Sequence, residues 1–320
     1  GPNLRVSALA VGPDHLNVYV GGMFDSAGGQ PAMNIARWDV QQQKWFPLGA
    51  GVGTPANNVT ALAVEGASVY AGGNWRDVMG RPVVSKWDGK KWTPVGNGVG
   101  NDSTRGDIIM GITVHARQIY AGIWGDIGRE NIVVWNGNSW SPFGGGVGAV
   151  VFATLWAGSD LFVGGNFSTA GNQPANHIAK WEGQSWQPLG NGANGLVRAF
   201  ARKEGDLYLV GDFTRVGGKP ANNIARWHAP VSIGTGASPT TGGTSSGDGI
   251  FPYGKGVTVH AAANAGYDFI NWSEDGQAVS GSANYTFPAT ASRILVANFK
   301  RKEFTIATSS VPARISPAVS

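Results

Sequence analysis

One phrase occurs three times in this sequence with few changes. It reads YVGGMFDSAGGQPAMNIARWD at Tyr19–Asp39, FVGGNFSTAGNQPANHIAKWE at Phe162–Glu182 and YLVGDFTRVGGKPANNIARWH at Tyr208–His228. Shortened forms of its second half, VSKWDGKKWTPVG and IVVWNGNSWSPFG, lie between the first two copies. The leading tryptophans of the five forms are Trp38, Trp87, Trp135, Trp181 and Trp227. Their spacing of 46–49 residues indicates a chain built from stacked copies of one unit.

Each unit divides into four short apolar runs separated by turn residues. In the second unit these runs are Val59–Gly66, Ser68–Trp75, Val83–Gly89 and Lys91–Gly96. The Asp-Gly pair between the last two favours a two-residue hairpin, because both residues tolerate positive φ. A four-stranded antiparallel sheet cannot cover both of its own faces, whereas copies stacked about an axis bury each sheet between two neighbours. The pattern therefore predicts an all-β fold, a β-propeller of about five four-stranded blades.

The expected blades lie near residues 4–50, 58–98, 107–146, 149–192 and 195–228, within a domain of residues 1–228. The fifth blade lacks the WxPLG strand that ends the others, and the sequence opens on a first strand. The sequence allows two arrangements of the ring of blades. Either the fifth blade has three strands and the ring closes, or further blades lie upstream in a longer protein. We favour five blades here.

The consensus LYVGGxFxxAGGxPAxNIAxWDGxxWxPLG resembles the kelch-like propeller repeats of large bacterial surface proteins. It is also similar to the repeats of the fungal cortical cell-polarity marker family. The resemblance covers about residues 4–228, with the second and third units departing most, at NWRDVMGRPVV and GIWGDIGRENIVV. It implies a propeller in an extracellular setting and no established catalytic residues.

A different vocabulary begins after His228. Residues 229–300 contain GGT, GVTVHAA, AGYDFINWSEDG, YTF and ANF in this order. These segments resemble the hallmarks of the divergent internalin B-type repeat, also called the Listeria–Bacteroides repeat. The resemblance implies a small β-rich spacer domain typical of bacterial surface proteins. Residues 301–320 read as the start of a second copy or a C-terminal tail, and we expect the chain to be part of a longer exported protein.

Composition excludes several classes of function. The sequence has no cysteine, which excludes disulfides, cysteine-ligated zinc, iron–sulfur clusters, a cysteine nucleophile and the Cys–Tyr crosslink of kelch-type copper oxidases. The net charge of +4 is not gathered into a stripe of Lys and Arg, so we expect no nucleic-acid partner. No apolar run approaches the roughly 18 residues of a membrane span, so we expect no membrane insertion in this segment.

Catalytic signals are weak. The repeated Ser-x-Asp-x-Gly-x-x-Trp box of sialidases is missing from the sequence. Glycosidases need paired carboxylates, but the innermost-strand runs VSALAV, VTALAV, IIMGITV, VVFATLW and LVRAFAR contain none. We therefore expect no enzyme activity and no cofactor. The five histidines lack ligand spacing, and GNDSTRGD, with Asp102 and Asp107, is the one weak candidate for a cation loop.

The repeated tryptophans are expected to pack in the core, so aromatic residues outside the repeat are the better ligand candidates. Trp75 and Trp124 replace the Phe of GGxF, and Trp156 lies in a first strand. A second set of candidates is polar and aligns just before the third strand of four units: Asn34, Asn131, His177 and Asn223. This set suits either a structural turn or a ring of groups for a small ligand, and we favour the turn.

The sequence leaves three functional hypotheses. The first is a non-enzymatic extracellular or cell-surface adhesion protein, whose propeller binds a protein or glycan ligand and whose B-type repeat is a spacer. The second is a carbohydrate-binding, lectin-like module of a larger secreted protein. The third is a glycan-active enzyme with carboxylates on the loops between blades.

Overall fold

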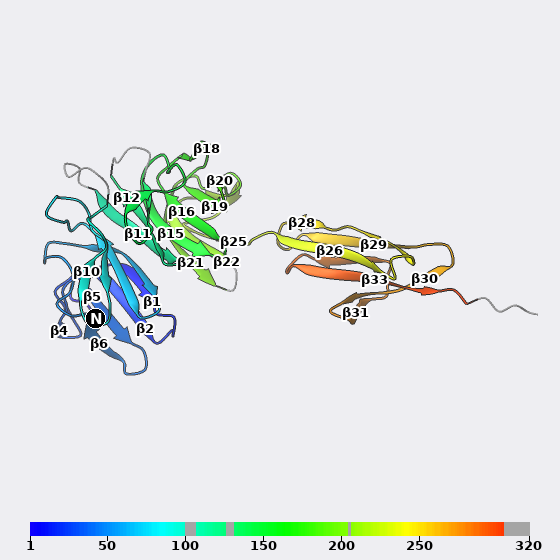
Figure 1. Cartoon of the computed structure of the whole chain (residues 1–320), viewed down its shortest axis with the longest axis horizontal. Coiled ribbons are helices and arrows are strands. Elements are labelled where there is room, and N and C mark those ends of the chain that lie inside the picture. Colours follow the sequence, from blue (N-terminus) through cyan, green and yellow to red (C-terminus); the bar gives the residue numbers. More distant parts are fainter. Residues whose placement is uncertain (100–106, 126–130, 204–205, 304–320) are drawn as a thin grey trace, which may run out of the picture. The chain divides into compact units, whose positions relative to one another are not determined.

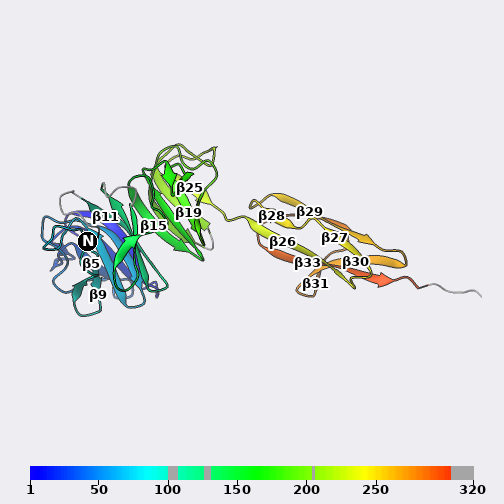
Figure 2. The same ribbon diagram turned by 45° about the horizontal axis from the view of Figure 1, so that its top comes forward.

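A computed structural model describes residues 1–99, 107–125, 131–203 and 206–303 (Figures 1 and 2). The chain divides into two units, Gly1–Trp227 and His228–Ser320. The described residues form strands and turns and contain no helix, which confirms the all-β prediction. In these same ranges nothing has the length and apolar character of a membrane-crossing helix.

The N-terminal unit contains four antiparallel sheets of four strands each. The first is β1 (Arg5–Val11), β2 (Asn17–Met23), β5 (Ile35–Asp39) and β6 (Lys44–Pro47). The second is β7 (Val59–Glu65), β8 (Ser68–Gly73), β9 (Ser85–Trp87) and β10 (Trp92–Pro94). The third is β11 (Ile108–His115), β12 (Gln118–Trp124), β13 (Ile132–Trp135) and β14 (Trp140–Pro142). The fourth is β15 (Val151–Ala157), β16 (Asp160–Gly165), β19 (Ile178–Glu182) and β20 (Ser185–Pro188).

A fifth sheet has three strands among the described residues: β21 (Leu196–Lys203), β22 (Asp206–Asp212) and β25 (Ile224–Trp227). Short hairpins follow the second strand of the first, fourth and fifth sheets. They are β3 (Ser26–Ala27) with β4 (Gln30–Pro31), β17 (Thr169–Ala170) with β18 (Gln173–Pro174), and β23 (Arg215–Val216) with β24 (Lys219–Pro220). These hairpins are what the AGGxPA part of the phrase encodes: Gly28 and Gly29 make the turn at φ values of 61° and 77°.

The sheets stack in chain order through their first strands, with β7 on β1, β11 on β7, β15 on β11 and β21 on β15 (Figure 1). One contact is repeated at each step: a β-branched residue of the later sheet packs on a glycine of the earlier one. The four pairs are Val59 on Gly21, Ile109 on Gly72, Val151 on Gly122 and Val197 on Gly164. A Cβ on Gly72 would lie 2.5 Å from Ile109, so a side chain at this position would separate the sheets.

Tryptophan pairs make a second repeated contact farther from the inner strands. The indole rings of Trp38 and Trp45 lie 5.2 Å apart across β5 and β6, and the next three sheets carry the same pair. The second tryptophan of each of those three sheets also donates its indole N–H to a carbonyl just after the last strand of the preceding sheet. These bonds are Trp92 to Leu48 (2.9 Å), Trp140 to Val95 (3.0 Å) and Trp186 to Gly144 (2.9 Å).

The core of this unit lies between sheets rather than inside any one of them. One buried cluster joins Ile35 and Leu48 of the first sheet to Val59 and Val69 of the second. Another joins Ile178 of the fourth sheet to Leu207 and other residues of the fifth. Each sheet therefore depends on its neighbours for burial, which is the property that a repeat fold requires.

The second unit is a sandwich of two sheets. One sheet has the order β28 (Gly249–Phe251), β26 (Val231–Ser238), β33 (Arg293–Arg301), β30 (Tyr267–Glu274) and β31 (Gln277–Ser280), with β26 and β33 parallel. The other has the order β27 (Gly243–Ser246), β29 (Gly256–Ala263) and β32 (Asn284–Pro288). Trp272, Leu295 and Val259 are fully buried in the core of this sandwich. The start of this unit is rich in Gly, Ser and Thr and resembles a linker by composition. It nevertheless includes β26 and β27, which pair with other strands of the two sheets.

Candidate ligand-binding groove between the first two sheets

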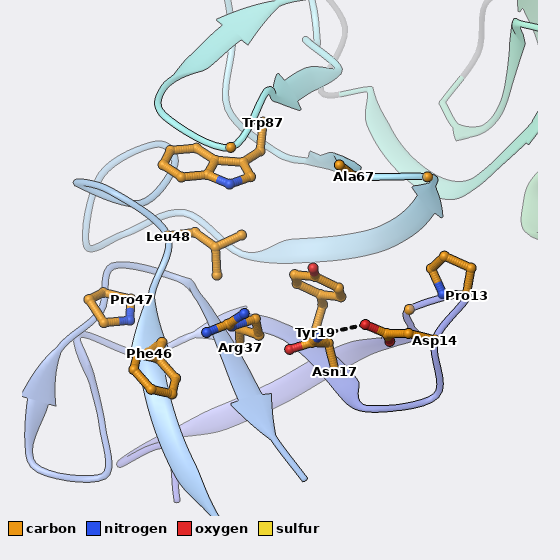
Figure 3. Close-up of a pocket in the computed structure, with 13 residues that line it drawn as sticks. Pro13, Asp14, Asn17, Tyr19, Arg37, Phe46, Pro47, Leu48, Ala67 and Trp87 are labelled. Atoms are coloured by element: carbon orange, nitrogen blue, oxygen red, sulfur yellow. Dashed lines mark hydrogen bonds between the residues drawn. The ribbon is translucent and has the colours of Figure 1, made fainter. Parts of the chain in front are cut away.

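A groove of about 580 Å³ opens between the first and second sheets (Figure 3). The first sheet contributes Asp14, Tyr19, Arg37 and Phe46 among its lining residues, and the second contributes Trp87. In Figure 3 the Tyr19 ring and the Arg37 side chain lie on one side, and the Trp87 indole lies on the other. The groove therefore combines aromatic side chains with one cation and one anion.

The loop between β1 and β2 holds Asp14 at one end of the groove. Its carboxylate accepts the backbone N–H of Leu16 at 2.9 Å and the side-chain amide of Asn17 at 2.8 Å. The N–H of Gly12 also donates to the carbonyl of Asn17 at 2.8 Å, and His15 takes the left-handed φ of 57°. The bond from Leu16 lowers the pKa of the Asp14 carboxyl below its usual value. Asp14 is therefore an ionised hydrogen-bond acceptor, and hydrogen bonds within the loop hold it in place.

Tyr19 and Arg37 face each other across β2 and β5. The Arg37 guanidinium lies over the Phe46 ring, 4.6 Å from its centroid, which is a cation–π contact. Partial burial raises the pKa of the Tyr19 hydroxyl; the charge of Arg37 opposes this shift, and that of Asp14 adds to it. Tyr19 therefore keeps its proton at neutral pH and can both donate and accept hydrogen bonds.

One difference between this interface and the third lies at a single residue of β7. Val64 occupies the register position that Trp156 occupies on β15, since each lies three residues after the alanine that follows the strand bulge. Trp156 stacks on His115 at 4.2 Å and meets Tyr120, the counterpart of Tyr19, edge-on at 5.2 Å. Val64 has no indole to place against Tyr19 in this way. A valine at this position does not open a groove by itself, because Val114 holds it in the second interface, where Tyr70 is buried.

The groove suits binding better than catalysis. Flat aromatic faces bind sugar rings and apolar side chains, while Arg37, Asp14 and Tyr19 offer donors and acceptors around them. Among the described residues that line the groove, Asp14 is the only carboxylate, and hydrolysis of a glycosidic bond needs two. In the five inner strands the only carboxylate is Glu65, which is exposed at the end of β7.

The three tryptophans proposed from the sequence lie in different places, and none lines the groove. Trp75 is buried and donates to the hydroxyl of Ser85 at 3.2 Å. Trp156 fills the third interface, as described above. Trp124 has 49% of its surface exposed and pairs with Ile108, which places it one residue before the Phe position of GGxF. It is therefore not the counterpart of Trp75. A ligand contact by any of the three stays a prediction.

The aligned polar residues occupy tight turns. Asn34, His177 and Asn223 have left-handed φ values of 61°, 63° and 62°, a conformation that asparagine and histidine tolerate better than most residues. Asn34 is fully buried and donates both amide hydrogens, to the carbonyl of Val52 at 2.9 Å and that of Thr54 at 2.7 Å.

The other three members of this set also make hydrogen bonds with nearby backbone. The Asn223 amide donates to the carbonyl of Gly211 at 2.8 Å, and the His177 ring nitrogen Nδ1 lies 3.2 Å from that of Gly165. Asn131 is buried, and its carbonyl accepts the N–H of Ile123 at 2.9 Å. These bonds agree with the turn interpretation that we favoured. A role of the four residues in ligand binding stays a prediction.

The weak cation candidate is only partly visible. Asp102 lies outside the described residues. Asp107 is buried, and its backbone carbonyl accepts a hydrogen bond from Arg76 at 2.8 Å. Within the described ranges no three His, Asp or Glu side chains gather in a way that could hold a metal ion.

The comparisons with known proteins bear mainly on the second unit. Residues 233–303 match the divergent InlB B-repeat domain. This match confirms the resemblance inferred from the hallmarks of residues 229–300, and the second unit is called the B-repeat below. No curated protein shows significant similarity to the sequence.

Solved structures give distant matches to the fold. The computationally designed Ika8 protein is 16% identical with a TM-score of 0.45, and the match covers 71% of this chain and 59% of that one, less than two thirds. A structure of YCF48 bound to D1 peptide is 10% identical with a TM-score of 0.43, covering 93% of this chain and 82% of that one. A structure of a nidogen/laminin complex is 15% identical with a TM-score of 0.38, and the match covers 64% of this chain and 71% of that one. TM-scores below 0.5 say nothing about ligands.

Proposed function

We propose that this chain is a non-enzymatic binding protein of the extracellular space or cell surface. In this proposal the N-terminal unit is the interaction platform, its repeats are kelch-like, and the B-repeat is a spacer. InlB-type repeat domains occur in surface proteins, which supports the setting. The groove between the first two sheets supports the binding role and is the observation that carries the proposal.

A glycan is the ligand class that the groove favours. Tyr19, Phe46 and Trp87 offer aromatic faces, and sugars present apolar ring faces that stack on such groups. Arg37 and Asp14 can hydrogen-bond the equatorial hydroxyls at the rim. A peptide with an acidic and an aromatic side chain would use the same groups, so it is the second outcome of the test.

The test is binding of the full chain to a glycan array and, in parallel, to a peptide library. Arg37→Ala is the groove variant, and Tyr19→Phe is a second variant that removes only a hydroxyl. Lys86→Ala is the matched control, because Lys86 occupies the register position of Arg37 in the second sheet and lies 5.5 Å from the Tyr70 ring centroid. Thermal unfolding of each variant separates loss of ligand contact from loss of fold.

We expect Arg37→Ala to weaken glycan binding at least about tenfold and Lys86→Ala to change it by less than about twofold. Binding to peptides alone, with the same dependence on Arg37, would replace the glycan by a protein ligand. Equal losses in Arg37→Ala and Lys86→Ala, or hits that neither variant changes, would show that the groove is not the site. Hydrolysis of a bound glycan would overturn the non-enzymatic assignment.

A further inference from the structure

The contact between successive sheets follows one rule. The residue that packs on the earlier sheet is Val59, Ile109, Val151 or Val197, and we call it the inserting residue. The residue that receives it is Gly21, Gly72, Gly122 or Gly164, and we call it the receiving glycine. All four inserting residues are fully buried. The rule holds at all four steps. It therefore identifies, in any sheet of this unit, the side chain that packs on the preceding sheet.

In the part of the chain that the structure describes, the inserting side of the first sheet is largely exposed. Val6 occupies the inserting position, because it pairs with Gly22 as Val59 pairs with Gly73. Its exposed fraction is 43%, against 0% for Val59. Leu9 and Val11 follow on the same side of β1, at the positions of Leu62 and Val64, with exposed fractions of 66% and 55%. We call Val6, Leu9 and Val11 the first face.

The tryptophan contact points the same way. In the second, third and fourth sheets the second tryptophan donates its indole N–H to a carbonyl just after the last strand of the preceding sheet. Trp45 has the same place and the same pairing with Trp38, but its indole N–H makes no such bond within the described residues. An aliphatic row and an indole donor are thus both placed for a neighbour.

The fifth sheet of this chain does not have the matching surface. Val210 stands at the receiving position, where the four earlier sheets have glycine. A Cβ on Gly21 would already lie 2.9 Å from the Cβ of Val59, so a valine there cannot accept an inserting side chain at the same separation. Val210 and Ile224 are exposed by 39% and 59%. Neither ring closure nor head-to-tail packing of two copies reproduces the repeated contact.

We propose that the first face binds a further sheet of this same repeat, one that carries glycine at the receiving position. The partner must offer a glycine to Val6, apolar cover to Leu9 and Val11, and a carbonyl to the Trp45 indole N–H. The inference does not depend on the ligand groove or on its occupant.

The test adds such a sheet to the full chain. A copy of residues 149–193, which contains the fourth sheet and Gly164, is fused directly to Asn3. The junction keeps the natural spacing, because Asn3 and Asn194 make equivalent bonds to the backbone N–H groups of Asp25 and Thr214. Leu9→Cys supplies the only thiol in an otherwise cysteine-free sequence. The rate of thiol labelling then reports cover of the first face.

We expect the added sheet to slow labelling of the thiol at position 9 at least about tenfold and to raise the denaturant midpoint. The matched control carries Gly164→Val in the added copy, which imitates Val210, and we expect its labelling rate to stay within about twofold of the unfused chain. Gly164→Ala in the copy should give an intermediate rate. Hydrogen exchange in the copy's own strands verifies that each added sheet is folded.

Equal protection by the glycine and valine copies would overturn the proposal, because the receiving glycine would then be irrelevant. Failure of a folded, glycine-bearing copy to slow labelling would also overturn it. A dimer of the unfused chain in sedimentation, dissociated by Leu9→Lys, would assign the first face to a second copy of this chain instead. None of these outcomes bears on whether Arg37 binds a glycan.

Discussion

Val59 of β7 lies directly on the backbone of Gly21 in β2, so that a Cβ on the glycine would be 2.9 Å from the valine Cβ. The pair explains two features of the repeated phrase at once. The first glycine of GG leaves space for a side chain of the next sheet. The β-branched residue early in each inner strand occupies that space. Interior packing leaves no room for an added methyl group here. Sheet separation is therefore encoded by a pair of residues in different repeats.

Trp92→Phe is expected to destabilise the second sheet by about 1 kcal/mol more than Trp45→Phe destabilises the first. Both changes remove one indole from an equivalent tryptophan pair, but only Trp92 donates to the preceding sheet, to the carbonyl of Leu48. Denaturant unfolding monitored by hydrogen exchange in each sheet measures the difference. Equal effects would mean that the indole–carbonyl bond contributes nothing to stacking.

Asn34→Ala is expected to cost about 2–3 kcal/mol, because it forces alanine into left-handed backbone and leaves the carbonyls of Val52 and Thr54 without their donor. Asn34→Gly keeps the backbone conformation and should cost about 1 kcal/mol less. Asn223→Ala, at the exposed counterpart, should cost less than Asn34→Ala. Urea titration ranks the three variants. A larger loss for Asn223→Ala would contradict the structural role of the buried amide.

The B-repeat should lose stability in acid through one ion pair. Arg293 donates to the Glu274 carboxylate at 2.7 Å, and this bond lowers the pKa of Glu274 below its usual 4.5. A depressed folded-state pKa gives stability that is complete above the unfolded-state pKa and is lost as pH falls through the folded-state value.

Urea unfolding at about pH 6 and about pH 3, read by pulse proteolysis of the B-repeat, measures this contribution. Glu274→Gln cannot titrate, so its stability should fall less between the two pH values than that of the unchanged chain. If both proteins lose the same amount, Glu274 is not a source of the acid sensitivity.

Much of the fold could be predicted because it is encoded locally. The run Val59–Gly66 predicted a strand that the structure ends at Glu65, and the turn glycines marked the hairpins. The B-repeat hallmarks were recognisable because they include core residues such as Trp272 and Phe287. The sequence also indicated a fifth sheet without its last strand, and three strands are present in the described residues.

The groove could not be predicted in this way. Tyr19, Arg37 and Phe46 belong to the repeated phrase or lie close behind it, so they read as packing groups. The space beside this tyrosine position also involves the next repeat, as Trp156 against Tyr120 shows in the third interface. The identity of this residue was no signal by itself, because the second interface has Val114 at the position of Val64 and its Tyr70 is buried. The assignment of Trp124 to the Phe position of GGxF was wrong. The third repeat has Ile123 where others have the second glycine, so the phrase that marks this position is missing there.

The double-mutant cycle of Gly21→Ala and Val59→Ala tests the stacking rule most directly. Gly21→Ala overpacks the contact and Val59→Ala empties it, so each alone should cost about 1–3 kcal/mol in denaturant unfolding. In the double variant the added methyl group takes part of the vacated space. We predict that it is at least about 1 kcal/mol more stable than the sum of the single losses implies. Additive losses, with no coupling between the two positions, would contradict the account.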